Sequence, residues 1–248
     1  MSAPAISEQI ALVTGASRGI GAAIALALAE RGADVAITYE RSADRAAEVV
    51  RSIEGRGRRG LAIQADSADA AAVTRSVAEA VDGLGGLDIL VNNAGIARGG
   101  TVESMSLSDI DALLNVNVRS VVLASQAAIP HLGAGGRIVS IGSCLAERVP
   151  FPGVTVYSMT KSALLAFTRG LARELGPRDI TVNLVQPGGT DTDMNPAEGA
   201  QADGIRSLTA LGRYGTPDDV AAAVAVLVSP AARQISGSVV TVDGGLNA

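Results

Sequence analysis

The sequence predicts an α/β fold in which a doubly wound parallel sheet of about seven strands is covered by helices on both faces. Strand-like and helix-like segments alternate along the whole chain, which is the pattern of parallel β-α-β units. The expected strands are apolar and lack a polar face, so both of their faces should be covered. The 248 residues contain no linker or break in composition, so we expect a single domain over residues 1–248.

Each expected strand is a short apolar run that ends at polar or turn-forming residues. The first run stops at a glycine cluster that begins at Gly15, the fourth ends at Asn92, and the sixth is halted by Pro187. The expected strands are 10–14, 34–39, 61–64, 87–91, 137–141, 180–185 and 239–242.

The expected helices are bounded by residues that favour helix ends. Gly32 and Gly83 suit the position after a helix, while Thr216 and Pro217 suit a helix start. The expected helices are 22–31, 43–53, 68–81, 107–132, 155–175 and 218–227. Residues 188–215 are the least regular stretch, and a loop of that length is typical of a lid over a binding site.

Composition and charge exclude several classes of protein. The net charge of −5 argues against a surface that binds nucleic acid, and the 2% of aromatic residues argues against a base-stacking binder. The longest apolar runs, such as residues 220–228, are shorter than the ~18 residues that a membrane span needs. One Cys, one His and an N-terminus without a signal-peptide pattern predict a cytoplasmic protein that has no disulfide and no metal site.

A glycine-rich loop joins the first expected strand to the first expected helix. It reads Thr14-Gly-Ala-Ser-Arg-Gly-Ile-Gly21, with the spacing G-x-x-x-G-x-G. Gly15 suits a tight turn, Gly19 lets a pyrophosphate approach the backbone, and Gly21 lets the helix pack close to the strand. The helix N-terminus presents free N–H groups and a partial positive charge to a phosphate. The sequence therefore predicts a dinucleotide site here.

Four motifs together resemble the short-chain dehydrogenase/reductase family. They are the glycine loop, Asn92-Asn93-Ala94-Gly95, the pair Tyr157-x-x-x-Lys161, and Pro187-Gly188. The resemblance covers essentially the whole chain and is closest to the branch of 3-oxoacyl-carrier-protein reductases, which includes many carbonyl reductases. It implies a Rossmann-type sheet of seven strands, a nicotinamide cofactor and a homotetramer.

The end of the second strand predicts NADP(H) rather than NAD. The family's acid that bonds the ribose 2′-hydroxyl corresponds to Tyr39, so no carboxylate at that position would repel a 2′-phosphate. Arg18, Arg41 and Ser42 are expected around the 2′-phosphate, since guanidinium groups bind phosphate well. Glu40 is expected to point away from Tyr39. The alternative is that both arginines are solvated surface charges.

The resemblance also implies the other cofactor contacts. Asp66 resembles the family's acid that bonds the adenine amino group, with Ser67 beside it, although Asp66 is also a good helix cap. Asn93 to Gly95 resemble the segment under the adenine ribose, and Pro187 to Thr192 the segment that holds the carboxamide. The full expected set is Gly15, Ser17, Arg18, Gly19, Ile20, Gly21, Tyr39, Arg41, Ser42, Asp66, Ser67, Asn93, Ala94, Gly95, Tyr157, Lys161, Pro187, Gly188, Thr190 and Thr192.

Tyr157 and Lys161 are four residues apart on an expected helix, so they share one face. A tyrosine that works as an acid or base near neutral pH needs a pKa ~2–3 below its usual ~10, which asks for about 3–4 kcal/mol. An ammonium group ~4–5 Å away supplies about that much at an effective dielectric of ~20. The lysine is therefore expected to lower the pKa of Tyr157.

Two further residues complete the catalytic set that the resemblance implies. Ser143 resembles the serine that donates to the substrate carbonyl, and Ser140 is the competing candidate. Asn117 resembles the asparagine that holds a proton-relaying water next to Lys161, while Asn115 should face differently on the helix. The expected reaction is hydride transfer to a carbonyl carbon, with Tyr157 as the general acid and Ser143 and Tyr157 stabilising the oxygen.

The expected substrate pocket is mostly apolar and suits a neutral ketone or aldehyde. Its expected lining is Cys144, Leu145, Val149, Phe151, Val154 and Met194. The leading function is therefore an NADPH-dependent carbonyl reductase. One alternative is a 3-oxoacyl-carrier-protein reductase, for which Arg178 provides one basic docking position and Ala134 lacks the other. The second alternative is a nucleotide-binding regulator without turnover.

Several residues with chemical potential are expected to be structural. His131 is expected at a surface helix end, and the basic run from Arg56 to Arg59 in a solvated turn. Cys144 has no histidine to activate it, so it is expected to line the pocket rather than to act as a nucleophile.

Overall fold

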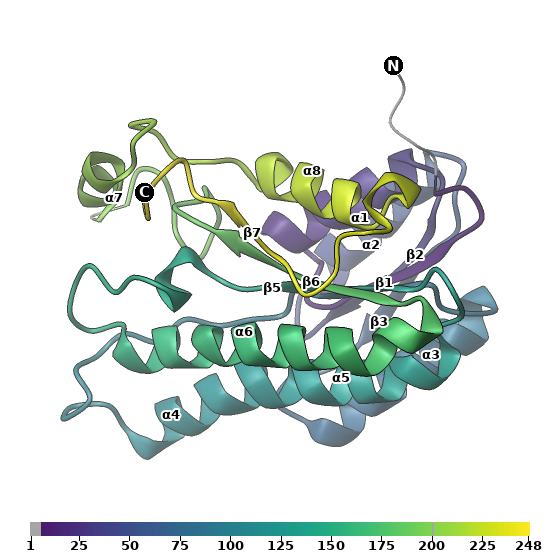
Figure 1. The fold of residues 1–248 in the computed structure, drawn as a ribbon, viewed down its shortest axis with the longest axis horizontal. Helices are drawn as coiled ribbons and strands as arrows, with labels where there is room; N and C mark the ends of the chain where they lie inside the picture. Colours follow the sequence, from purple (N-terminus) through teal and green to yellow (C-terminus); the bar gives the residue numbers. More distant parts are fainter. Residues whose placement is uncertain (1–5, 200) are drawn as a thin grey trace.

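The computed structural model describes residues 6–199 and 201–248, and it contains the expected sheet. Seven parallel strands lie in the order β3-β2-β1-β4-β5-β6-β7 (Figure 1). The strands are β1 (Ile10–Val13), β2 (Asp34–Tyr39), β3 (Gly60–Gln64), β4 (Ile89–Asn92), β5 (Arg137–Ile141), β6 (Thr181–Pro187) and β7 (Val239–Val242). The predicted fold class is therefore confirmed.

The strand order reverses between β1 and β4, and this reversal positions the site. The chain builds outward from β1 through β2 to β3, then returns to the other side of β1 and continues from β4 to β7. At such a switch point the loops leaving the two neighbouring strands diverge and leave a crevice at their carboxyl ends. The loops after β1 and β4 carry the glycine-rich motif and the Asn92–Gly95 motif.

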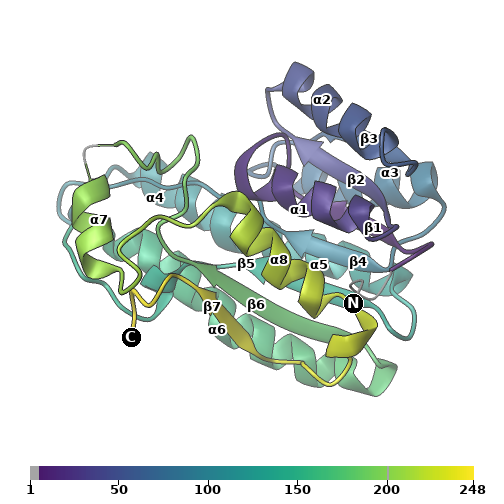
Figure 2. The same ribbon diagram turned by 90° about the horizontal axis from the view of Figure 1, so that it is seen from above.

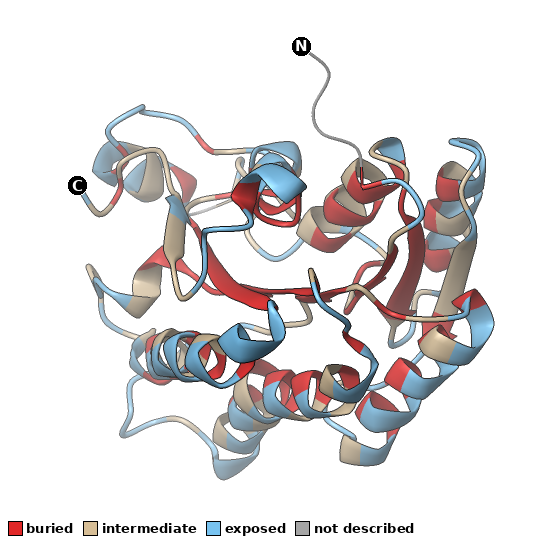
Figure 3. Ribbon diagram, turned by 45° about the vertical axis from the view of Figure 1, so that its right-hand side comes forward, coloured by how far each residue is buried: buried red, intermediate tan, exposed pale blue. Residues whose placement is uncertain are grey.

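Helices cover both faces of the sheet (Figures 1 and 2). Apolar residues of α1 (Gly19–Glu30), α2 (Ala43–Glu54) and α8 (Pro217–Leu227) pack on one face. Those of α3 (Ala70–Leu84), α5 (Ser120–Ala128) and α6 (Thr155–Leu175) pack on the other. Strands β1, β4, β5 and β6 are buried along their whole length, as Figure 3 shows for the centre of the sheet. Because helices cover both faces of the sheet, its strands are apolar on both sides, as the sequence predicted.

The predicted helix 107–132 is interrupted. Helix α4 (Leu107–Leu114) passes through a π-helical turn at Asn115–Arg119 into α5, and a 3₁₀ turn follows at Ile129–His131. The run Leu107–His131 also has the length and apolar composition to cross a membrane, contrary to the expectation from the uninterrupted apolar runs. Of its most apolar 18-residue window, 44% is buried in the protein, so much of that apolar surface serves packing.

Several boundaries differ from the prediction by one to three residues, and those of α3 have an identifiable cause. Helix α3 begins at Ala70 rather than residue 68, because the Asp69 side chain accepts from the Ala71 N–H as the N-cap. It ends at Leu84, with Gly85 in the left-handed region at φ +90°, so Gly83 does not stop it. A short helix, α7 (Ala202–Leu208), lies inside the stretch that was predicted to be irregular.

The basic turn before β3 is a structural clamp on Asp34, at the start of β2. The Asp34 carboxylate accepts from the Arg59 backbone N–H at 2.9 Å and from its Nε at 2.7 Å, and Arg58 Nη2 lies 2.7 Å away. Arg59 also donates to the Leu84 carbonyl at the end of α3. Burial favours a higher pKa for Asp34, but the hydrogen bonds from Arg59 and the charges of both arginines outweigh it and lower that pKa.

We expect Asp34→Asn to lower the free energy of unfolding by about 1–2 kcal/mol at pH 7, because Arg58 and Arg59 lose a charged partner. The lowered pKa means that this stabilisation is present above the unfolded-state value of ~3.9 and is lost as the pH falls through the folded-state pKa. Urea midpoints at pH 7 and pH 3 measure it. The control is Asp203→Asn, which removes a fully exposed carboxylate paired with Arg206 and should change neither midpoint. A variant midpoint equal to that of wild type at pH 7 would contradict the clamp.

Candidate active site

One large cleft, with a volume of about 1160 Å³, lies at the carboxyl ends of the central strands. Every residue of the predicted cofactor set lines it, and so do Ser143, Tyr157 and Lys161. Asn117 is fully buried behind this surface. Ser140, the competing serine, is also fully buried and does not line the cleft; its hydroxyl accepts from Asn92 Nδ2.

The glycine loop has the geometry of a phosphate cradle. Gly15 and Gly19 have φ of +63° and +56°, which residues with a Cβ rarely adopt. A Cβ on Gly21 would lie 2.4 Å from Asn93 Nδ2 and 2.7 Å from the Gly15 carbonyl, so only glycine fits under this turn. No side chain caps the start of α1 at Arg18, so the N–H groups of the first turn face an anion-binding position. The residues present therefore fit a dinucleotide.

The second motif is tied directly to the glycine loop. Thr14 Oγ1 accepts from the backbone N–H groups of Asn93 and Ala94, at 3.0 Å each. Asn93 Nδ2 donates to the carbonyls of Thr14 and Gly15 at 2.9 and 3.0 Å. These bonds hold the ends of β1 and β4 together at the floor of the cleft.

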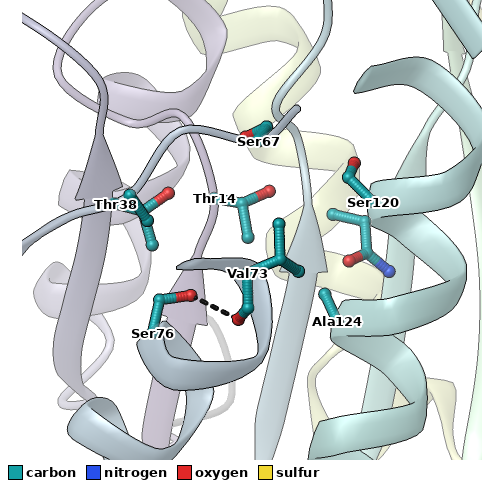
Figure 4. A pocket seen from close by; sticks show the side chains of 9 residues that line it. Thr14, Thr38, Ser67, Val73, Ser76, Ser120 and Ala124 are labelled. Carbon is teal, nitrogen blue, oxygen red and sulfur yellow. Dashed lines mark hydrogen bonds between the residues drawn. The ribbon is translucent and has the colours of Figure 1, made fainter. Parts of the chain in front are cut away.

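A smaller cavity of about 10 Å³ lies beneath this floor (Figure 4). It is lined by Thr14, Thr38, Ala65, Ser67, Val73, Ser76, Asn92, Ser120 and Ala124. Its volume suits one water molecule and no organic ligand. Thr38 supports the glycine loop from this side, because its hydroxyl accepts from the Gly15 N–H at 2.9 Å.

The structure adds charged residues to the end of the cleft where the 2′-phosphate is predicted. Arg18 Nη1 and Arg45 Nη1 lie 3.2 and 2.7 Å from the same carboxylate oxygen of Asp193, in the loop after β6. Arg41 Nη2 lies 2.7 Å from Glu40, which lines the cleft together with Tyr39. Strand β2 ends at Tyr39, so Glu40 lies in the turn that follows the strand, beside the predicted phosphate position. The sequence alone gave no signal for Arg45 or Asp193.

Asp66 lines the predicted cofactor cleft, whereas the expectation that it caps the following helix is wrong. Its side chain accepts from the Ala68 N–H at 2.8 Å, and it lines the cleft next to Ser67. The cap of α3 itself is Asp69, so Asp66 shapes the turn that precedes the helix.

Burial dominates the chemistry of the tyrosine–lysine pair. Lys161 Nζ lies 6.0 Å from the centroid of the Tyr157 ring and donates to the Ile141 carbonyl at 3.0 Å. Burial lowers the pKa of Lys161 to about 8. Burial also raises the pKa of Tyr157, and the adjacent Ser143 hydroxyl acts in the opposite direction. This direction is opposite to the predicted one, because the loss of hydration destabilises the phenolate more than its surroundings stabilise it.

Asn117 belongs to the π-helical turn between α4 and α5. Its Oδ1 accepts from the Ile96 N–H, and its Nδ2 donates to the Ile96 carbonyl and to Thr160 Oγ1, at 2.9, 2.9 and 3.1 Å. Such single π turns are frequent at functional sites, where they redirect a side chain. Asn117 thereby fixes the segment after Gly95 against α6. Asn115 is half-buried, and no bond of its side chain to the site is described.

The wall beside Tyr157 is mostly apolar. Of the expected lining, Cys144, Leu145, Phe151, Val154 and Met194 are present, whereas Val149 is 51% exposed and lies outside it. The cleft also includes Arg98, Gln201, Ile205 and Leu246, which the sequence gave no reason to select. Leu246 belongs to the C-terminal segment, where Asn247 Nδ2 donates to the Cys144 carbonyl at 2.7 Å.

Three residues with chemical potential remain, namely Cys144, His131 and Arg178. Burial raises the pKa of Cys144 to about 11, so its thiol is neutral near pH 7. His131 is exposed, and Arg178 donates to the carbonyls of Ile129 and Leu132. Within residues 6–199 and 201–248, no cluster of three or more His, Cys, Asp or Glu side chains could hold a metal ion.

A dinucleotide cradle beside a Ser-Tyr-Lys group defines a nicotinamide-dependent oxidoreductase, and comparison with known proteins gives its family. The family described as enoyl-(acyl carrier protein) reductase matches residues 15–247. A short-chain dehydrogenase from Burkholderia cenocepacia J2315, solved in complex with NADP, is 62% identical with a TM-score of 0.97, covering 98% of this chain and 99% of that one. The chain belongs to the short-chain dehydrogenase/reductase family.

Curated relatives of different function are almost equally similar. A 3-oxoacyl-[acyl-carrier-protein] reductase from Synechocystis sp. (strain ATCC 27184 / PCC 6803 / Kazusa) is 40% identical, covering 98% of each chain. A cyclic-di-GMP-binding biofilm dispersal mediator protein from Escherichia coli (strain K12) is 42% identical, covering 98% of this chain and 99% of that one. Similarity alone therefore does not select a substrate.

We expect Gly21→Ala to weaken NADPH binding at least tenfold and to cost about 1–3 kcal/mol of stability, since the new methyl group collides with Asn93 and Gly15. Fluorescence titration and urea midpoints measure the two effects. Gly170→Ala is the matched control, because Gly170 is an exposed residue of α6 with no atom within 4 Å of the added Cβ. It should stabilise the protein by up to ~1 kcal/mol. Unchanged NADPH binding in Gly21→Ala would contradict this geometry.

Proposed function

We propose that the protein is an NADPH-dependent carbonyl reductase that converts a ketone or aldehyde to an alcohol. The observation that carries this proposal is the placement of Ser143, Tyr157 and Lys161 in the same cleft as the glycine loop. A binder without turnover has no need for a half-buried tyrosine and a buried lysine next to a serine hydroxyl. The mostly apolar wall beside Tyr157 supports a carbonyl compound with an apolar body.

The predicted set of cleft-lining residues would hold the cofactor, with the glycine loop and the N-terminus of α1 at its phosphates. When bound, NADPH supplies the hydride for the carbonyl carbon. The choice of NADP(H) is supported by Tyr39 in place of an acid and by Arg18 and Arg41 in the cleft. It is also supported by the Burkholderia relative, which was solved with NADP.

The residues of the chain supply the proton and the orientation. Tyr157 donates its proton to the carbonyl oxygen, and its raised pKa keeps that proton in place until negative charge develops there. Ser143 donates a hydrogen bond to the same oxygen and stabilises the alkoxide character. Lys161, as a cation, stabilises the tyrosinate that remains, and Asn117 fixes the adjacent segment through Ile96.

Two alternatives have specific support. The Synechocystis relative favours a 3-oxoacyl-carrier-protein reductase. Against it, Arg178 is engaged with the carbonyls of Ile129 and Leu132, and the net charge is −5. The Escherichia coli relative favours a nucleotide-binding regulator, which would need no proton donor at Tyr157.

We also propose a single cytoplasmic domain that assembles as a homotetramer and uses residues 188–215 as a substrate lid.

We expect wild-type protein to oxidise NADPH with at least one member of a panel of activated ketones, diketones and 3-oxoacyl thioesters. Tyr157→Phe should lower that rate at least ~100-fold while still binding NADPH, because only the proton donor is lost. Ser143→Ala should also lose most of the rate, whereas Ser140→Ala is the matched control and should keep it. Absence of turnover across the panel, or full activity of Tyr157→Phe, would support the regulator instead. A strong preference for thioesters would select the carrier-protein reductase.

We expect the rate of carbonyl reduction to be level below pH 8 and to fall above it. Lys161 is cationic below its pKa of about 8, and its charge is lost as the pH rises through that value. Tyr157 stays protonated over this range because its pKa is raised. Initial rates from pH 6 to 9.5, with circular dichroism as a control for folding, test this. In Lys161→Arg the guanidinium does not titrate, so whatever rate remains should lack the fall. A wild-type rate that stays level to pH 9.5 would contradict the assignment.

A further inference from the structure

The charged residues that line the cleft divide into two groups. Arg18, Glu40, Arg41 and Asp66 follow β1, β2 and β3, at the end where the adenosine is proposed to bind, and Asp193 is paired with Arg18. On the other side, after β4 and β5, the described lining contains two charged side chains, Arg98 and Lys161. The proposed mechanism uses Lys161 and leaves Arg98 without a role.

Arg98 lies between two segments that contact the catalytic residues. Three residues before it is Gly95, where an added Cβ would lie 3.3 Å from Lys161 Nζ and 3.5 Å from Asn117 Oδ1. Two residues after it, the Gly100 N–H donates to the Gly153 carbonyl at 2.8 Å, four residues before Tyr157. Three residues span at most ~11 Å, so the Arg98 backbone lies within that distance of the segment beside Lys161.

Arg98 lines the cleft, and its guanidinium is only partly engaged within the protein. Its Nε lies 3.4 Å from Asp109, whose carboxylate also accepts from the Ser106 hydroxyl at 2.7 Å. Its Nη1 donates to the Ala97 carbonyl at 3.0 Å, and Nη2 has no described partner. Both partners of the ion pair are about half exposed, so the pair is weak and a ligand anion can compete for the arginine.

The surroundings of Arg98 match an anionic carbonyl compound. The wall beside Tyr157 is formed by Leu145, Phe151, Met194, Ile205 and Leu246. The carboxylate of Asp193, next to Met194, is already paired with Arg18 and Arg45. A guanidinium offers two parallel donors to a carboxylate or phosphate group. An apolar wall with one cation at its edge fits an apolar chain that carries an oxyanion.

We propose that Arg98 binds an oxyanion of the substrate, and that the preferred substrates are therefore oxo acids rather than neutral ketones. This proposal rests on the proposed reductase function, with the carbonyl at Tyr157 and the oxyanion several carbons away at Arg98. It makes Arg98 the residue that determines substrate charge in this cleft.

The test compares substrates that differ only in charge. Reduction of 4-oxopentanoate and 5-oxohexanoate by NADPH is measured against their methyl esters, and against the corresponding oxoalkyl phosphates. The variants are Arg98→Gln, which removes the charge, and Arg98→Lys, which keeps it. Arg75→Gln is the matched control, because Arg75 is an exposed arginine on α3 that does not line the cleft.

We expect wild-type kcat/KM to be at least tenfold higher for one class of anion than for the neutral ester. Arg98→Gln should abolish that preference and leave kcat/KM for the ester within about twofold of the wild-type value. Arg98→Lys should retain part of the preference, and Arg75→Gln should retain all of it. Whichever of carboxylate and phosphate is preferred identifies the oxyanion. A wild-type preference for the ester, or an equal loss for ester and anion in Arg98→Gln, would overturn the proposal.

Calorimetric titration of the same anions, in the presence of NADP, separates this proposal from the reductase function. If nothing is turned over but wild type binds an anion that Arg98→Gln does not bind, the oxyanion site stands and the reductase function fails. If esters are reduced but no anion is bound or reduced through Arg98, the reductase function stands and the oxyanion site fails. If there is neither turnover nor Arg98-dependent binding, both are overturned.

Discussion

The site depends on the hydrogen-bonded junction between the ends of β1 and β4. At a topological switch point the two following loops run in opposite directions, and without a cross-link the crevice between them would have no fixed floor. Here Thr14 Oγ1 accepts two backbone N–H groups from the β4 loop, and Asn93 returns two hydrogen bonds to the β1 loop. Gly21 lets α1 approach this junction, because any side chain would strike Asn93. The phosphate cradle and the catalytic side of the cleft are thereby built on one rigid base.

From this base, polar contacts extend into the buried region behind the catalytic pair. Gly95 follows the junction directly and lies against Lys161 and Asn117. Asn117 then bonds both backbone groups of Ile96 and reaches Thr160 on α6, the helix that carries Tyr157 and Lys161. The same packing that fixes these groups removes water from them, which raises the pKa of the tyrosine and lowers that of the lysine. The same packing therefore fixes the positions of Tyr157 and Lys161 and shifts their pKa values.

The loop after β6 closes the structure over the glycine loop. Its ends are joined, since the Gly215 N–H donates to the Gly189 carbonyl and the Asp191 N–H donates to the Gly215 carbonyl. Asp193 on this loop meets Arg18 of the glycine loop and Arg45 of α2. Asp193 therefore links the predicted lid to Arg45 and to Arg18, and Arg18 is also predicted to bind the cofactor phosphate.

Most strands, most helices and the motif residues could be predicted from the sequence, because their signals are local: apolar runs, caps, glycine spacing and a four-residue helical interval. The family motifs also identified Ser143 over Ser140, and the structure places only Ser143 on the cleft. What the sequence could not supply depends on contacts between distant segments. The π turn at Asn115–Arg119, helix α7, the pairing of Asp193 with Arg45, and the place of Arg98 in the cleft all have no local signature. The direction of the tyrosine pKa was mispredicted for the same reason: spacing places a lysine nearby, but burial by the whole fold sets the cost of charge.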